Sequence, residues 1–227
     1  MVLTTFLNQK KKKMSFPKVH VMRETNQTLG LQTIIRNKNC SRDDFIFYSN
    51  RLIRLLLEEA LSFLPYNTIV VTTNTDSEYI GSQWACKVCG VSIIRAGESM
   101  ENGLSSICKD IRIGKILIQR DESTAEPKLY YTKFPFDIAE RYVILMDPML
   151  ATGGSAITAI KVLIDKGVSE EHIIFANLIA VPEGIQNLSL KFPKVQIVTT
   201  CIDEKLNDSK FIIPGIGDFG DRYFGTD

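Results

Sequence analysis

Apolar residues in this chain form short continuous runs, and stretches with helical spacing lie between them. The clearest unit begins with the apolar run 143–146, which is typical of a buried strand in a parallel sheet. Pro148 ends this strand, because proline has no N–H group to donate to a neighbouring strand. From Ser155 onward, apolar residues recur at helical spacing until Gly167, a residue type that commonly follows the last turn of a helix. The pattern therefore predicts a strand, a loop of small residues and a helix.

Further strands and helices alternate along the rest of the chain. A long helix is predicted over residues 45–64, after the capping pattern that begins at Ser41 and before Pro65. Strands are predicted at 68–73, 90–94, 115–119, 172–181 and 195–200, a strand of a hairpin or flap at 128–132, and helices at about 99–109 and 182–191. This alternation predicts an α/β fold with a mostly parallel central sheet and helices on both faces. We expect one domain over residues 21–227 with a C-terminal hood, preceded at residues 1–20 by a flexible tail or an arm against a partner subunit.

The composition narrows the class of protein. The chain has 227 residues, of which 44% are hydrophobic and 23% charged, and its net charge is +1. A charge so close to neutral gives no electrostatic case for nucleic acid or a membrane as the main partner. No apolar run is long enough to cross a bilayer, and the lysines at 10–13 are not followed by the apolar stretch of a secretory signal. Five irregularly spaced cysteines predict free thiols, so we expect a cytoplasmic protein without a zinc site.

The loop that follows the strand 143–146 has the composition of a phosphate-binding site. The first turn of a helix carries unpaired backbone N–H groups and a partial positive charge, and both favour an anion. Gly153 and Gly154 allow close approach of the backbone, while Thr152 and Ser155 offer hydroxyl donors. Asp147 suits ribose hydroxyls or a bound Mg²⁺ rather than the phosphate itself. An ordinary connection with a serine N-cap accounts for the same loop, so the loop alone leaves both interpretations open.

Two arginines stand at the ends of other predicted strands. Arg95 follows the strand 90–94, and Arg120 follows the strand 115–119. Ligands of open parallel sheets bind beyond the carboxyl ends of the strands, and the planar fork of arginine donates two hydrogen bonds to a phosphate. Beside a phosphate-type loop, this pair predicts a diphosphate site.

The C-terminal stretch is rich in glycine. Gly215, Gly217 and Gly220 match the spacing of the dinucleotide-binding fingerprint, but only seven residues follow them, too few for the strand–helix–strand unit that this fingerprint requires. A glycine-rich loop after Pro214 can instead present backbone N–H and C=O groups to the edge of a pyrimidine. A simple ordered turn is the alternative.

Taken together, four stretches resemble the uracil phosphoribosyltransferase family of type I phosphoribosyltransferases. They are Ile94-Arg-Ala-Gly97, Gln119-Arg-Asp-Glu-Ser-Thr124, the loop from Asp147 to Ser155, and residues 212–226, in that family's order. Most type I enzymes carry a second acid after the first, whereas Pro148 stands there in this chain, as in the uracil-specific version. The resemblance implies the type I fold and transfer of the phosphoribosyl group of 5-phosphoribosyl 1-pyrophosphate (PRPP) to uracil, which gives UMP and pyrophosphate. It also implies Mg²⁺ bound through PRPP rather than at a protein-only site.

The same resemblance implies roles for individual residues. The catalytic residues would be Arg95, Arg120 and Asp218, the last as the first candidate for a general base. PRPP would be bound by Arg95, Arg120, Asp147, Pro148, Met149, Leu150, Ala151, Thr152, Gly153, Gly154, Ser155 and Asp218. Uracil would be framed, largely by backbone atoms, by Ala151, Ile212, Gly217, Asp218 and Phe219.

The resemblance suggests a homodimer or homotetramer, and stimulation by GTP through the candidate effector residues Arg42, Arg51, Arg112 and Lys115, although exposed basic residues are commonly just solvated. Phosphoribosyltransferases for orotate or hypoxanthine usually keep the paired acid, so Pro148 disfavours them. A non-catalytic nucleotide sensor or RNA-binding regulator of the same fold would be favoured by loss of the loop, the arginines or the C-terminal glycines, and all of these are present.

Overall fold

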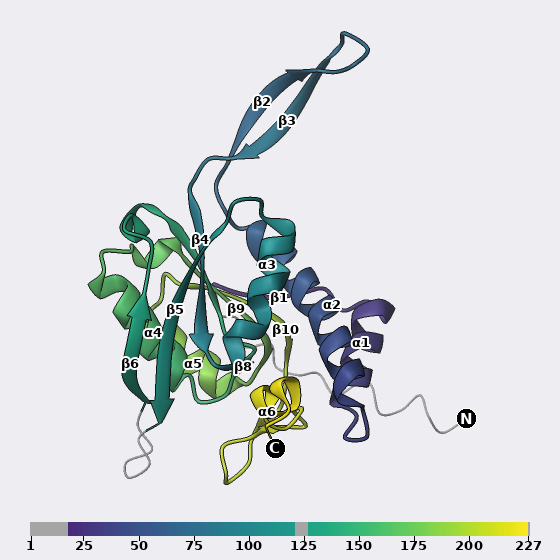
Figure 1. The fold of residues 1–227 in the computed structure, drawn as a ribbon, viewed down its shortest axis with the longest axis vertical. Helices are drawn as coiled ribbons and strands as arrows, with labels where there is room; N and C mark the ends of the chain where they lie inside the picture. The colour runs from purple at the N-terminus through teal and green to yellow at the C-terminus, as the bar shows by residue number, and fades with distance from the viewer. Residues whose placement is uncertain (1–17, 121–126, 227) are drawn as a thin grey trace.

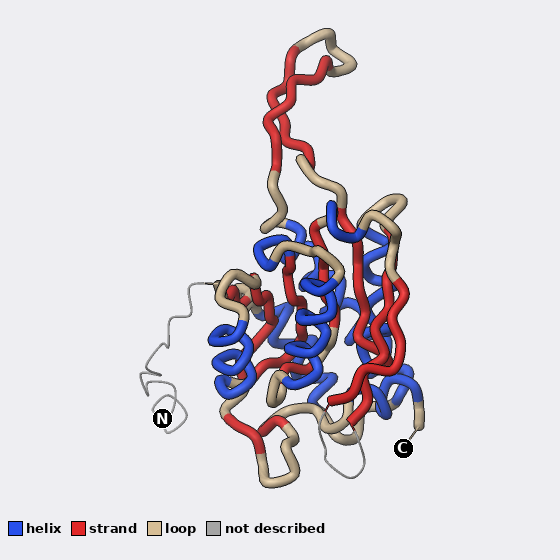
Figure 2. Tube along the Cα trace, turned by 90° about the vertical axis from the view of Figure 1, so that its left-hand side faces the viewer, coloured by secondary structure: helices blue, strands red, loops and turns tan. Residues whose placement is uncertain are grey.

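The computed structural model of the chain describes residues 18–120 and 127–226. Within these residues, an eight-stranded sheet forms the centre of the molecule, as Figures 1 and 2 show. Its order is β1 (Val19–Val21), β10 (Gln196–Ile202), β9 (Ile173–Ala180), β7 (Tyr142–Met146), β4 (Val88–Ile94), β5 (Arg112–Arg120) and β6 (Pro127–Lys133), with the short β8 (Met149–Leu150) also beside β9. All neighbours are parallel except β5 and β6. The predicted α/β fold with a mostly parallel sheet is confirmed.

The central strands are apolar because both of their faces are covered. Every residue of β9 is buried, and alternate residues point to opposite faces of the sheet. Ile174 and Ala176 pack into one hydrophobic cluster, while Ile173 and Phe175 pack into the other. The continuous apolar runs predicted as strands at 143–146 and 172–181 therefore reflect two buried faces.

Helices form a layer on each face of the sheet (Figures 1 and 2). On one face lie α1 (Asn26–Arg36), α2 (Arg42–Leu61) and α3 (Glu101–Ile107), and on the other lie α4 (Gly154–Asp165) and α5 (Pro182–Lys191). Three short 3₁₀ helices, η1 (Ala96–Met100), η2 (Ile138–Glu140) and η3 (Glu170–His172), connect other elements of the described chain.

The long helix predicted at 45–64 is α2, and its N-terminal cap is the one expected. The hydroxyl of Ser41 accepts a hydrogen bond of 3.1 Å from the backbone N–H of Asp44. The helix ends at Leu61, shortly before Pro65. In contrast, no pattern of the sequence predicted α1, whose N-cap is Thr25.

The strand predicted at 68–73 is present but lies outside the central sheet. It forms β2 (Tyr66–Thr72), which pairs antiparallel with β3 (Glu78–Trp84) in a hairpin that projects from the body of the molecule (Figures 1 and 2). Most residues of this hairpin are exposed. Its β-branched residues indicated a strand correctly, but local sequence does not say which strand will be the neighbour.

The C-terminal segment lies at the carboxyl end of the central strands, where the hood was expected (Figure 1). It contains the two-stranded pair β11 (Lys205–Leu206) and β12 (Ile212–Ile213), followed by the short helix α6 (Phe219–Phe224). The strand predicted at 128–132 is β6, which is antiparallel to β5.

At the other terminus, residues 1–17 of the expected tail lie outside the described residues. Val19 and His20 already belong to the edge strand β1, because their backbone pairs with Ile197 and Val198 of β10. The sheet thus begins before residue 21, the expected start of the domain. No helix of the described residues is both long and apolar enough to cross a membrane.

Candidate active site

The predicted site residues converge on the carboxyl edge of the sheet. The strands β4 and β7 run parallel and side by side, with Ser92 opposite Met146. The segments after these strands, which begin at Arg95 and Asp147, therefore leave from the same edge. Arg120 is the last residue of β5, the other neighbour of β4, so its backbone is at this edge too. Residues 121–124 of its motif lie outside the described part of the chain.

The loop between β7 and α4 encloses a pocket. It is lined by Asp147 and by residues 149–156, which are most of the residues predicted to bind PRPP. The helix α4 begins at Gly154, and its N-cap is Gly153, whose φ of +85° lies in the left-handed region that glycine adopts readily. A serine N-cap, the ordinary alternative for this loop, is therefore not what the chain uses.

The first part of this loop is more ordered than the sequence indicated. Met149 and Leu150 form β8 and pair with Ile179 and Ala180 of β9. The carbonyl of Pro148 accepts hydrogen bonds from the backbone N–H groups of Leu178 and Ile179, at 2.9 and 3.1 Å. The pocket is consequently built on a stretch of backbone that is fixed to the central sheet.

The start of α5 supports the loop from behind, which sequence reasoning missed. A Cβ atom on Gly184 would overlap the carbonyl oxygen of Ala151 and lie 2.9 Å from that of Leu150. The side-chain amide of Asn187 donates a hydrogen bond of 3.0 Å to the carbonyl of Thr152. Only the close packing of Gly184 had a visible sequence signal, a glycine near the start of a predicted helix.

Asp147 is the first residue of the loop, and the pKa of its carboxyl is raised above the ordinary value. The pKa of its carboxyl is raised to about 7, mainly by burial and to a smaller extent by the negative charge of Asp218, while a hydrogen bond from the backbone N–H of Met149 opposes the shift. The electrostatic effect of Asp218 on Asp147 means that the C-terminal segment reaches the phosphate-type loop.

Arg95 contacts the same C-terminal segment. Its Nη2 lies 2.6 Å from Oδ1 of Asp221, and its Nη1 donates a 2.6 Å hydrogen bond to the hydroxyl of Thr226. The guanidinium carbon lies 5.7 Å from the centre of the Phe224 ring. Just beyond Arg95, Gly97 packs so closely against the carbonyl oxygen of Met146 that a Cβ atom would overlap it, which ties the Arg95 segment to the end of β7.

The predicted uracil residues divide into buried and exposed ones. Ile212 and Phe219 are 5% and 2% exposed, and the Phe219 ring lies 5.3 Å from the Phe45 ring, so both side chains belong to the core. Gly217 and Asp218 are exposed. Asp218 also caps α6, since its Oδ1 accepts a 2.9 Å hydrogen bond from the backbone N–H of Asp221. This division leaves Gly217 and Asp218, rather than Phe219, exposed to a ligand.

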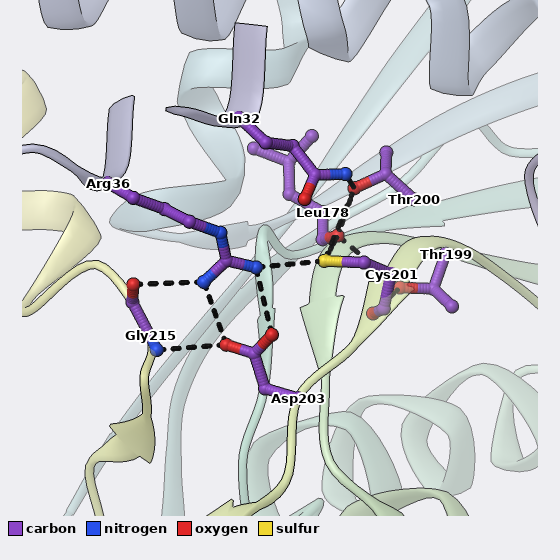
Figure 3. Close-up of polar contacts among 8 residues, drawn as sticks. All are labelled: Gln32, Arg36, Leu178, Thr199, Thr200, Cys201, Asp203 and Gly215. Atoms are coloured by element: carbon purple, nitrogen blue, oxygen red, sulfur yellow. Dashed lines mark hydrogen bonds and ion pairs between the residues drawn. The ribbon is translucent and has the colours of Figure 1, made fainter. Parts of the chain in front are cut away.

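An ion pair that no sequence pattern predicted holds the loop in front of these residues. The guanidinium of Arg36 lies 2.8 and 2.9 Å from the two carboxylate oxygens of Asp203, and both side chains bind the backbone of Gly215 (Figure 3). Arg36 ends α1, and Asp203 follows β10. Nothing in the local pattern connects these residues, because they are 167 positions apart.

The four candidate effector residues have different surroundings. Arg112 lies 3.1 Å from Asp137, and Lys115 lies 2.6 Å from Glu98 and 3.4 Å from Glu101. Arg42 donates a 3.2 Å hydrogen bond to the carbonyl of Tyr223, and Arg51 is exposed on α2. Among the described residues, no three His, Cys, Asp or Glu side chains gather as a metal site.

Comparison with known proteins gives the same assignment as the four motifs. Residues 21–226 match the sequence model of the uracil phosphoribosyltransferase family. The uracil phosphoribosyltransferase of Dictyostelium discoideum is 58% identical over 215 residues, which cover 94% of this chain and 100% of that protein. The solved structure of the AQ2163 protein from Aquifex aeolicus is similar, with a TM-score of 0.80, 28% identity, and coverage of 92% of this chain and 99% of that one. Adenine phosphoribosyl transferase from Trypanosoma brucei shares the fold, with a TM-score of 0.56 at 11% identity and coverage of 89% and 88%. The chain belongs to the uracil phosphoribosyltransferase family.

Proposed function

We propose that this protein transfers the phosphoribosyl group of PRPP to uracil, giving UMP and pyrophosphate. The observation that carries the proposal is the meeting of three predicted elements at one edge of the sheet: the pocket of the loop after β7, Arg95 after β4, and the C-terminal segment at Asp218. Family membership from residue 21 to residue 226 supports the same reaction.

Each group of PRPP is assigned to a different part of this site. The 5-phosphate takes the pocket at the N-terminus of α4, where N–H groups and the helix dipole favour an anion. Asp147 faces the ribose hydroxyls, and Arg95 and Arg120 bind the diphosphate through charge-assisted hydrogen bonds. Arg95 already stands at this edge, bound to Asp221, so diphosphate must replace or share that partner.

The reaction is a substitution at the anomeric carbon of the ribose. N1 of uracil forms the new bond as the bond to the diphosphate oxygen breaks, and the transition state resembles an oxocarbenium ion. The chain contributes by holding the two substrates in line and by neutralising the charge that develops on the leaving group. Asp218 is the first candidate to accept the N1 proton, because it is an exposed carboxylate beside the predicted uracil backbone.

Mg²⁺ fits this site only together with the donor. Carboxylates are suitable ligands, and the negative charge of Asp218 acts on the carboxyl of Asp147, but no three-residue metal cluster exists in the described part of the chain. When bound to PRPP, Mg²⁺ supplies further neutralisation of the diphosphate. The proposed ligands are therefore mainly oxygens of PRPP.

Uracil is read by backbone atoms of residues 217–219 and by Ala151. One edge of uracil alternates acceptor, donor and acceptor, which N–H and C=O groups of a folded loop can match. The exposure of Gly217 and Asp218 supports this assignment. The non-catalytic alternative has no comparable support.

Assembly, regulation and location are also proposals. Exposed apolar residues on the β2–β3 hairpin, among them Val70 and Ile80, support a homodimer or homotetramer. Stimulation by GTP stays a prediction, and Arg112 and Lys115 would have to exchange their present carboxylate partners for it. Five free cysteines among the described residues support a cytoplasmic location.

The test is UMP formation from uracil and PRPP with Mg²⁺, measured with and without GTP. Cytosine, orotate and hypoxanthine serve as control bases. Turnover that is selective for uracil is expected. Folded protein that binds PRPP but converts no base would contradict the proposal and favour a nucleotide sensor.

A further inference from the structure

We propose that Arg36 and Asp203 are positioning residues for uracil: together they fix the peptide of Gly215 and thereby set the base-reading backbone at 217–219. The inference rests on the proposed function. It concerns residues that contact neither the phosphate-type pocket nor Arg95 in the structure, and that lie in none of the four motifs.

The geometry is a closed set of four contacts around one glycine (Figure 3). Arg36 donates from Nη2 to Oδ1 of Asp203 at 2.8 Å and from Nη1 to Oδ2 at 2.9 Å. The same Nη1 donates to the carbonyl of Gly215 at 3.0 Å, and the N–H of Gly215 donates to Oδ2 of Asp203 at 2.9 Å. Both backbone polar groups of Gly215 are thus bound, one by the cation and one by the anion.

The pair is largely withdrawn from solvent. The side chain of Asp203 is 7% exposed and that of Arg36 is 21% exposed. Water and salt screen such a pair much less than a surface pair, and removal of one partner leaves the other charge uncompensated. Arg36 also donates to the sulfur of Cys201 at 3.1 Å, and the backbone N–H of Asp203 is bound to the carbonyl of Ala180 at the end of β9. The clamp is therefore anchored to the central sheet.

The position of Gly215 determines where the following residues, 217–219, lie. Gly215 has a φ of +59°, and a Cβ atom there would overlap the carbonyl oxygen of Ile212, so the loop turns back tightly on itself. The next residue, Ile216, is held through its carbonyl by the guanidinium of Arg222 at 2.7 Å, which also binds the carbonyl of Ile35 near the end of α1. Arg36 of α1 and Arg222 of α6 thus bind the carbonyls of the consecutive residues Gly215 and Ile216, just before Gly217.

Loss of the contacts between Arg36, Asp203 and Gly215 should affect uracil binding and PRPP binding differently. Recognition by backbone N–H and C=O groups needs those groups placed to within about 0.5 Å. A loosened Gly215 moves residues 217–219, whereas the pocket after β7 is built on β8, β9 and α4 and keeps its shape. Loss of the clamp is therefore expected to weaken uracil binding much more than PRPP binding, because Asp218 is the only one of the twelve expected PRPP-binding residues that lies in the moved segment.

The experiment compares Arg36→Gln, Asp203→Asn and Arg36→Lys with Glu140→Gln. The last variant removes the exposed ion pair between Glu140 and Lys87, which lies on other elements, and is the matched control. For each protein we would measure kcat, the KM for uracil, the KM for PRPP, the Kd for PRPP without uracil, and thermal unfolding. Arg36→Lys keeps the charge but loses the planar fork, so it tests geometry with the least risk to folding.

We expect the KM for uracil to rise about tenfold or more in Arg36→Gln and Asp203→Asn, which corresponds to about 1.4 kcal/mol. The Kd for PRPP should stay within about twofold of wild type, Arg36→Lys should be intermediate, and Glu140→Gln should be unchanged. Equal increases in the KM for uracil and the KM for PRPP would mean a merely structural role and overturn the inference. A lower fraction of active protein with an unchanged KM for uracil would overturn it as well. If Arg36→Gln or Asp203→Asn fails to fold, the KM for uracil of Arg36→Lys decides. Wild-type protein that makes no UMP would overturn the proposed function itself, and with it the role given to the clamp.

Discussion

The guanidinium of Arg95 lies 2.6 Å from the carboxylate of Asp221, so the arginine assigned to the diphosphate is bound to the C-terminal helix. The hydroxyl of Thr226 donates to the same carboxylate at 2.7 Å and accepts from Arg95. These hydrogen bonds, first that from Thr226 and then that from Arg95, lower the pKa of Asp221, so it is ionised at neutral pH. Arg95 therefore has two possible roles, as a ligand for diphosphate and as an anchor for the C-terminal segment.

Substitution of each partner separates these roles. Side chains at 43% and 36% exposure form a weak pair, and its loss alone should change little. We expect Asp221→Ala to lower kcat/KM for PRPP less than about threefold, and Arg95→Ala to lower it more than about tenfold, because the leaving group loses a cation. Steady-state kinetics with PRPP varied would check this. Equal losses in both variants would mean that Arg95 acts only as an anchor.

The second arginine is tested against a surface arginine. Arg120→Ala is expected to lower turnover more than about tenfold while thermal unfolding stays close to wild type, because a diphosphate ligand acts on the transition state rather than on folding. Arg54, exposed on α2, provides the matched control, and Arg54→Ala should keep full activity. A folded and fully active Arg120→Ala enzyme would remove Arg120 from the diphosphate site.

Local sequence predicted the parts of the fold that depend on short-range physics. The run 143–146, Pro148 and Gly167 predicted a strand, a stop and a helix end, and β7, the loop and α4 follow them. The same approach missed α1, because its sequence Asn-Gln-Thr-Leu-Gly-Leu contains residues with weak helix propensity. That helix is fixed instead by a cap in which Thr25 and Thr28 bind each other's backbone N–H groups.

Long-range pairing was the part that the sequence could not predict. Whether the strand at 68–73 joins the sheet or forms a hairpin depends on its neighbour, which local propensity does not specify. Likewise, Arg36 and Asp203 are ordinary charged residues until α1 and the end of β10 meet in space. Arg95, Arg120 and Asp147 were found because each stands at the end of its own strand, whereas the supports of the site, such as Asn187 under Thr152, come from other elements.

The raised pKa of Asp147 predicts a pH dependence of stability. Its carboxyl has a pKa of about 7 in the folded chain and an ordinary value of 3.8, so between these values the folded state holds a proton that the unfolded state has lost. The contribution of Asp147 to stability therefore falls as pH rises from about 4 to 7 and then levels off. Asp147→Asn should be as stable as wild type near pH 4 and more stable at pH 8. Chemical denaturation of both proteins at several pH values measures the difference, and a constant difference would contradict the shift.

The same equilibrium predicts tighter PRPP binding as Asp147 ionises. An ionised carboxylate accepts hydrogen bonds from ribose hydroxyls more strongly than a neutral acid does. The Kd for PRPP of wild type should therefore decrease between pH 6 and 8 by more than that of Asp147→Asn, in which only the phosphates of the ligand titrate. Titration calorimetry of both proteins across this range checks the prediction. Parallel pH profiles would show that the Asp147 carboxyl does not take part in binding.

The support of the phosphate-type loop by α5 predicts opposite outcomes for two glycine-to-alanine substitutions. In Gly184→Ala, the new methyl group overlaps the carbonyl oxygen of Ala151 and must displace the loop, which is expected to cost about 1–3 kcal/mol of stability and to raise the KM for PRPP. In Gly30→Ala, the methyl group enters open space on the exposed face of α1, so stability should increase by about 0.5–1 kcal/mol without a change in either KM. Denaturation curves and PRPP kinetics of the two variants measure both effects. A Gly184→Ala enzyme with wild-type KM for PRPP would show that the pocket does not depend on its contact with α5.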